Sequence, residues 1–167
     1  VAGTIPVSVG GSSAEAYQVG GSRGDIFGLW GEPLADTAEQ IERVREEAHA
    51  AGRTDAPRIW VTFRPIIAAT EELAWAKARR TLEGLRRGGG PMKAWRALNG
   101  PPQNVGSQRL LEIAARQDVH DRALWTPTAS ATGAAGASTA LVGTPETVAA
   151  AILDYVDLGA DLVSIRG

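Results

Sequence analysis

The stretch IPVSVGGSS at residues 5–13 indicates the fold class of this 167-residue chain. Its apolar run, residues 5–9, predicts a buried β-strand, and Gly10 and Gly11 predict the turn that ends it. Ser12 or Ser13 can then accept a hydrogen bond from a free backbone N–H group and start a helix. The stretch therefore predicts a strand, a tight turn and a helix in succession, which is the repeating unit of an α/β fold.

The same alternation recurs along the rest of the chain. We expect further strands at residues 25–30, 59–67 and 162–165, and a short strand or an extended segment at 139–143. Pro65 lacks the N–H group that a strand interior needs, so the third strand is expected to bend or end near Arg64. Parallel sheets with helical cover are built from units of this kind.

Capping patterns and periodicity place helices between these strands. Helix starts are expected at Ser12 or Ser13, at Asp36 with Glu39 in capping-box position, at Thr70, at Ser107 and at Thr144. The glycine-rich residues 20–24 are expected to break the first helix. Residues 126–138 are a tract of small residues. We interpret residues 1–167 as one partial domain, in which residues 86–138 form an α-rich, mobile insertion.

Composition excludes several classes of protein. With 17 Lys and Arg against 19 Asp and Glu, the net charge of −2 does not suit a domain that binds nucleic acid. No run of about 18 apolar residues is present, so no membrane contact is expected. The chain has no cysteine and two histidines, which excludes disulfides, thiolate chemistry and the usual zinc sites, and we expect no metal. These features predict a cytoplasmic protein.

Six stretches occur in the order and at about the spacing of one known family. They are VGGSS (9–13), DIFGLWGEP (25–33), FRPI (63–66), NVGSQRL (104–110), ATG (131–133) and TALVGTPE (139–146). Together they resemble the bacterial luciferase-like flavin-dependent monooxygenases, and within them the alkanesulfonate monooxygenase branch. The ordered set is more specific than any one of its members.

The resemblance implies a TIM (β/α)8 barrel with a long insertion. A typical barrel needs about 250 residues, so this chain would supply the C-terminal half, strands five to eight, with the α-rich insertion before the last strand. Because the only methionine is Met92, we do not expect Val1 to be the translation start. The implied cofactor is reduced FMN from a separate flavin reductase, and the implied substrate is a small organic molecule, with an alkanesulfonate as one candidate. We expect a homo-oligomer.

Gly10, Gly11, Ser12 and Ser13 are the candidate cofactor-binding residues. The glycines allow the backbone to approach a ligand, and the serines add hydroxyl donors at a helix N-terminus, where an anion is favoured. The alternative is an ordinary strand-to-helix turn with a serine cap. In the resembled family the flavin phosphate lies near this loop, which favours the phosphate site.

Trp30, Thr62 and Arg64 are the candidate catalytic residues. Trp30 would line the pocket at the mouth of the barrel, although it could equally be a core aromatic. Thr62 and Arg64 share one face of a strand, where Arg64 could balance the charge of a sulfonate or a reduced flavin, or pair with an acid such as Glu32. The alkanesulfonate branch has Arg and His at these two positions, so the substrate class stays open and a general acid–base candidate is lost.

The tract at residues 131–136 aligns with a loop that closes over the flavin in the resembled family. The family arginine is missing here, near Ala134 or Ala135, so a small-residue surface loop is the favoured interpretation. Two other functions stay open. One is an inactive half-barrel remnant or self-associating module that retains a phosphate cradle, and the other is a deazaflavin-dependent reductase.

Overall fold

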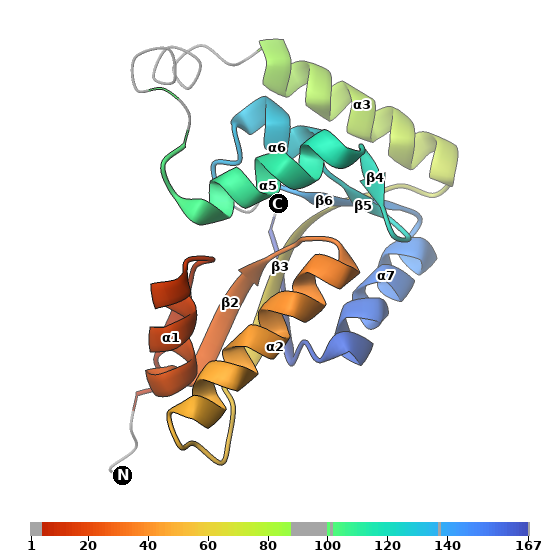
Figure 1. Ribbon diagram of the computed structural model, residues 1–167. Helices are drawn as coiled ribbons and strands as arrows, with labels where there is room; N and C mark the ends of the chain where they lie inside the picture. Colours follow the sequence, from red (N-terminus) through yellow and green to blue (C-terminus); the bar gives the residue numbers. More distant parts are fainter. Residues whose placement is uncertain (1–4, 88–99, 101, 137, 167) are drawn as a thin grey trace.

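The computed structural model describes residues 5–87, 100, 102–136 and 138–166, and its elements alternate as the sequence predicts (Figure 1). The elements in chain order are β1 Ser8–Gly10, α1 Ala14–Arg23, β2 Ile26–Trp30, α2 Leu34–Ala50, β3 Arg58–Ile67, α3 Glu71–Arg87, α5 Val105–Arg116, β4 Val119–His120, β5 Leu124–Trp125, α6 Pro127–Thr132, β6 Ala140–Gly143, α7 Pro145–Leu158 and β7 Leu162–Ile165.

Strands β1, β2, β3 and β7 form a parallel sheet that is covered on one face by α1, α2 and α7. Alternate side chains of β2 and β3, including Phe27, Val61 and Phe63, are completely buried against these helices. Figure 1 shows α1 and α2 crossing the same side of the sheet. The other face carries Trp60 and Thr62, and no helix of this group covers it. The core therefore lies on one side of the sheet.

Strand β3 exchanges partners along its length. Residues 60–63 pair with β7, whereas residues 64–67 pair with β6. The exchange occurs at Arg64, beside Pro65, where the sequence predicts a bend or an end. The strand continues to Ile67, so the prediction of an end is wrong, and the change of partner occurs at the predicted place.

Between α5 and β6 the structure has two short strands and a short helix that the sequence does not predict. Strand β6 pairs with β5 and β5 with β4, both antiparallel, which makes a small second sheet on the end of β3. The tract of small residues at 126–138 contains the short helix α6, and Ala129 and Ala134 within it are fully buried. The parts of the predicted 86–138 insertion at residues 88–99, 101 and 137 lie outside the described residues.

Two predictions for the first unit are wrong. The first strand is not buried, since Ile5 and Val7 are 86% and 51% exposed. Helix α1 also continues through Gly20 and Gly21 to Arg23. A Cβ on Gly20 would lie 2.2 Å from the ring of Phe27, so this glycine is present because helix and sheet are in close contact.

Helix caps follow the predictions at Ser13, Thr144 and Thr70, and they differ at two positions, Asp36 and Ser107. The hydroxyl of Thr70 accepts a hydrogen bond from the N–H of Leu73 at 3.3 Å. Ser107 lies inside α5, because the cap of that helix is Asn104. Ser13 and Thr144 cap α1 and α7, and Gly159 ends α7 with a φ of 116°. Asp36 is not a cap, because α2 begins at Leu34. Within the described part of the chain, none of the helices combines the length and apolar character needed to cross a membrane.

Candidate functional site

A cavity of about 800 Å³ lies at the carboxyl ends of β1 and β2, between the N-termini of α1 and α5. This volume is within the range of about 300–1,000 Å³ that is typical of small-molecule sites. The lining residues come from four segments: Gly10–Ser13 with Ala16, Gly28 with Trp30, Gln103–Ser107, and Ala135 with Gly136. The cavity thus brings together all four candidate cofactor-binding residues and Trp30.

The described lining of this cavity carries no charged side chain, and its polarity comes from hydroxyl, amide and backbone groups. Ser13 Oγ caps α1 by accepting a hydrogen bond from the backbone N–H of Ala16 at 3.2 Å. Asn104 Oδ1 caps α5 in the same way, 2.8 Å from the N–H of Ser107. The first N–H groups of a helix have no partner inside it and favour an anion, so two positive helix ends face one cavity.

Gly106 allows the beginning of α5 to lie close to Trp30 and Ser12 on the other side of the cavity. A Cβ at this position would lie 3.1 Å from Cζ3 of Trp30 and 3.5 Å from the hydroxyl oxygen of Ser12. Trp30 is half-buried, and it packs against Leu110 and Ala134 of the insertion while it also lines the cavity. The sequence allows Trp30 to be either a core aromatic or a pocket residue, and it is both, because its ring packs partly in the core and partly forms the wall of the cavity.

Thr62 and Arg64 do not line this cavity. Thr62 is buried, its hydroxyl lies 3.0 Å from that of Ser164, and it lines a neighbouring cavity of about 210 Å³ together with Trp30 and Arg166. Arg64 is exposed on the same face of β3, two residues beyond Thr62. The expected pair of Arg64 with Glu32 is not the one observed, because Glu32 pairs with Arg109.

The end of the tract at residues 131–136 lines the cavity, and its interpretation as a small-residue surface loop holds only for its two exposed residues, Ala135 and Gly136. Ala134 is completely buried, and its carbonyl oxygen accepts a hydrogen bond from the hydroxyl of Ser107 at 2.7 Å. Ala135 and Gly136 follow directly and line the cavity. Only at Ala134 does burial restrict the size of the side chain, since Ala135 and Gly136 are exposed.

Glu32 and Arg109 form a buried ion pair that sequence reasoning does not assign. Glu32 Oε2 lies 2.7 Å from Nε of Arg109, and the side chain of Glu32 is 2% exposed. Burial raises the pKa of Glu32 to about 7, and the hydrogen bond and charge of Arg109 oppose that rise. Glu32 lies in the stretch 25–33 and Arg109 in the stretch 104–110, both of which carry the family resemblance. Their place in these stretches is the sequence feature that could have pointed to them.

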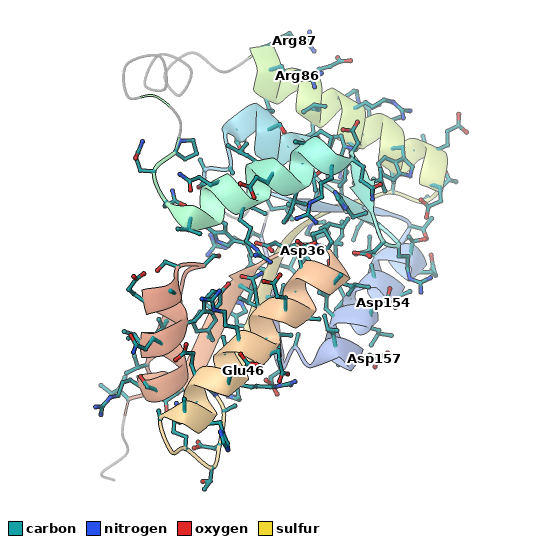
Figure 2. The ribbon with its side chains drawn as sticks, viewed as in Figure 1. Asp36, Glu46, Arg86, Arg87, Asp154 and Asp157 are labelled. Atoms are coloured by element: carbon teal, nitrogen blue, oxygen red, sulfur yellow. The ribbon has the colours of Figure 1, made fainter. Side chains whose placement is uncertain are left out.

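The second carboxylate of this cluster is Asp36. It binds both terminal nitrogens of Arg116, at 2.9 and 2.8 Å, and its backbone oxygen accepts from Arg109 at 3.1 Å. Figure 2 shows Asp36 at the end of α2 that faces α5. Ion pairs therefore fix α5, and with it one wall of the cavity, to the beginning of α2.

A family model described as luciferase-like monooxygenase matches residues 1–162. The chain belongs to the luciferase-like monooxygenase family. Membership explains why the cavity lies at the carboxyl ends of the parallel strands, which is where barrels of this architecture carry their sites.

Solved structures show the same fold. A riboflavin lyase (RcaE), solved with modified FMN and its substrate riboflavin, is 27% identical with a TM-score of 0.70, over 98% of this chain and 38% of that one. The EDTA monooxygenase of Chelativorans sp. BNC1 is 20% identical with a TM-score of 0.66, over 98% and 39%. The coenzyme F420 dependent tetrahydromethanopterin reductase of Methanopyrus kandleri is 16% identical with a TM-score of 0.55, over 96% and 44%.

The chain thus spans less than half the length of each of these three proteins. Its parallel sheet is an α/β half-barrel, as the sequence predicts. The fold likeness includes both flavin and F420 proteins, so it does not by itself distinguish these two cofactors.

Proposed function

We propose that the protein containing this chain is a monooxygenase that uses reduced FMN, supplied by a separate flavin reductase, and that the phosphate of FMN binds between α1 and α5. The observation that carries the proposal is the convergence of two capped helix N-termini and the Ser12 hydroxyl on one cavity. A phosphate monoester needs several donors at close range, and these groups provide them without a nearby carboxylate in the described lining.

The residues present fit this cofactor. Gly106 leaves open the space beside Ser12 and Trp30 that a Cβ would enter, and Gly10 and Gly11 keep the floor of the cavity free of side chains. When bound, reduced FMN supplies the electrons and the oxygen activation of a monooxygenase. The chain's own residues would hold the phosphate at Ser12 and the helix ends, and Trp30 would shield the cavity from water.

The substrate is a further part of the proposal. We propose a small organic molecule, with an alkanesulfonate as one candidate, because Arg64 is a cation on the strand face that also carries Thr62. A guanidinium is suited to a planar set of anionic oxygens. We also propose that the active protein is a homo-oligomer. The remaining half of the barrel is needed in addition to complete the site.

A titration with FMN and with riboflavin, in both redox states, tests the phosphate site. We expect FMN to bind clearly more tightly than riboflavin, because the two ligands differ in the phosphate. Ser12→Ala should weaken FMN binding roughly tenfold, the effect of about one hydrogen bond to a charged group, and leave riboflavin binding unchanged. Fluorescence quenching of the flavin measures both affinities.

Ser22→Ala is the matched control. Ser22 lies in α1 but bonds the carbonyl oxygen of Gln18 and does not line the cavity, so its removal should change neither affinity. Equal binding of the two flavins by the unaltered protein would contradict the proposal. Absence of saturable binding would favour the alternative function, a self-associating half-barrel without a working cofactor site.

Gly106→Ala tests the close contact between the two walls. The new Cβ would press on the Trp30 ring and enter the phosphate end of the cavity, so FMN affinity should fall by roughly a factor of ten or more. Folding should be little affected, because alanine is a better helix former than glycine by about 0.5–1 kcal/mol. Titration and thermal unfolding of the same sample measure the two effects.

Gly84→Ala is the control for helix propensity. Gly84 lies in α3, and a Cβ there would meet nothing within 4 Å. This variant should raise stability slightly and leave FMN affinity unchanged. If Gly106→Ala binds FMN as well as the unaltered protein does, the phosphate does not lie at the beginning of α5.

A further inference from the structure

A continuous set of hydrogen bonds joins the two walls of the cavity through one buried carboxylate. On the α5 side, Arg109 Nε donates to Glu32 Oε2 at 2.7 Å. On the α2 side, Gln40 Nε2 donates to the same oxygen at 2.9 Å. Glu32 is thus the group shared by α5 and α2, and all of these contacts lie outside the cavity lining.

Gln40 extends this set to the wall formed by α1. Because its NH2 group is held by the carboxylate, its oxygen must face the other way, where it accepts from the hydroxyl of Tyr17 at 2.9 Å. The same oxygen lies 3.5 Å from the hydroxyl of Ser12. The hydrogen bond from Tyr17 is the shorter of the two, so Gln40 holds Ser12 in place but forms only a weak hydrogen bond with its hydroxyl group. That hydroxyl group can therefore turn toward an anion.

Glu32 is also held at its backbone. Its carbonyl oxygen accepts from the hydroxyl of Tyr155 at 2.6 Å and from that of Thr37 at 3.1 Å. Both of these partners are buried, as is Gln40. A carboxylate fixed in this way can transmit a definite position from one helix to another, since neither its backbone nor its side chain has room to shift.

The ion pair between Glu39 and Arg109 does not join the two walls of the cavity in this way. Glu39 also contacts Arg109, at 3.3 Å, but its side chain is 64% exposed, and among the described residues it has no other ion-pair partner. The pair is therefore a solvated contact on one side of α5, whereas Glu32 joins both walls.

We propose that Glu32 is a positioning residue that sets the separation of the two helix ends, through Arg109 on α5 and through Gln40 and Ser12 on the opposite wall, and so determines how tightly the cavity holds a phosphate monoester. This inference rests on the proposed function, since the phosphate is that of FMN. It adds a role for a residue that does not touch the ligand.

The test compares FMN with riboflavin in Glu32→Gln, a nearly isosteric change. We expect the affinity for FMN to fall roughly tenfold, as for one misplaced hydrogen bond to an anion, while riboflavin binds as before. A purely structural role would weaken both ligands together. Glu39→Gln, which makes the same chemical change on a solvent-exposed partner of Arg109, should leave both affinities unaltered.

Arg109→Lys keeps the inference testable if Glu32→Gln does not fold. Lysine retains the positive charge at a partly exposed position but cannot reproduce the directed Nε bond, so it should also lose the preference for FMN over riboflavin. If the unaltered protein prefers FMN and both variants keep that preference, or if they lose both ligands equally, the positioning role is wrong and the proposed function stands. If the unaltered protein shows no preference, both proposals fail.

Discussion

Arg109→Ala is expected to destabilise the fold by about 2 kcal/mol at pH 8, because the carboxylate of Glu32 loses its cation and must take up a proton to stay buried, which costs about 1.4 kcal/mol per pH unit above 7. At pH 5 the loss should shrink to about 1 kcal/mol, the effect of one hydrogen bond. The difference arises because the pKa of Glu32 is raised to about 7, so at pH 5 the carboxyl group is neutral in both proteins. Urea unfolding at several pH values measures the effect.

The sign of this pH dependence follows from proton binding. An ordinary glutamate in the unfolded chain titrates near 4.5, and folded Glu32 near 7, so the folded state binds more protons between these values. The contribution of Glu32 to stability is therefore complete below pH 4.5 and lost as the pH rises through 7. Without Arg109 the pKa rises further, and the loss above pH 7 becomes larger.

Arg122→Ala is the matched control for this prediction. Arg122 pairs with Asp154 at 2.9 Å, but both side chains are accessible, 51% and 29% exposed. Its removal should cost less than about 1 kcal/mol and show no change near pH 7. A destabilisation by Arg109→Ala that stays constant from pH 5 to pH 8 would show that Glu32 does not carry the buried charge.

Gly20→Ala is expected to destabilise the protein by about 3 kcal/mol, because an added methyl group would overlap the ring of Phe27. The ideal Cβ position lies 2.2 and 2.3 Å from two atoms of that ring, and Phe27 is completely buried. The backbone of α1 must therefore move away from β2. Equilibrium unfolding in urea measures the loss.

The same substitution at Gly84 serves as control, since it should stabilise α3 by about 0.5–1 kcal/mol. The two variants make one chemical change in two helices, and only the packing differs. If Gly20→Ala were as stable as Gly84→Ala, the close contact between α1 and β2 would not exist.

Features that depend on neighbouring residues could be predicted from the sequence. The caps at Ser13 and Thr144 and the end of α7 at Gly159 each need a hydrogen bond or a backbone angle within a few residues. The candidate loop Gly10–Ser13 and Trp30 also belong to one cavity, because parallel strands end at the same edge of a sheet. Their role toward FMN stays a prediction.

Features that depend on distant packing could not be predicted in this way. Gly20 and Gly21 look like helix breakers in isolation, and only the contact with β2 and α2 explains them. Asn104 was missed as a cap because it follows a stretch rich in Gly and Pro. Glu32 and Arg109 are 77 residues apart, and no periodic pattern links them.

The exchange of partners along β3 has a consequence for synthesis on the ribosome. Strand β2 precedes β3 and can pair with it at once, but Ser164, the partner of Thr62, is made 102 residues later. At the usual speed of translation, about 5–20 residues per second, one edge of the central strand stays open for roughly 5–20 s. An open apolar strand edge is a template for wrong pairing, so the nascent chain is most prone to aggregation in that interval.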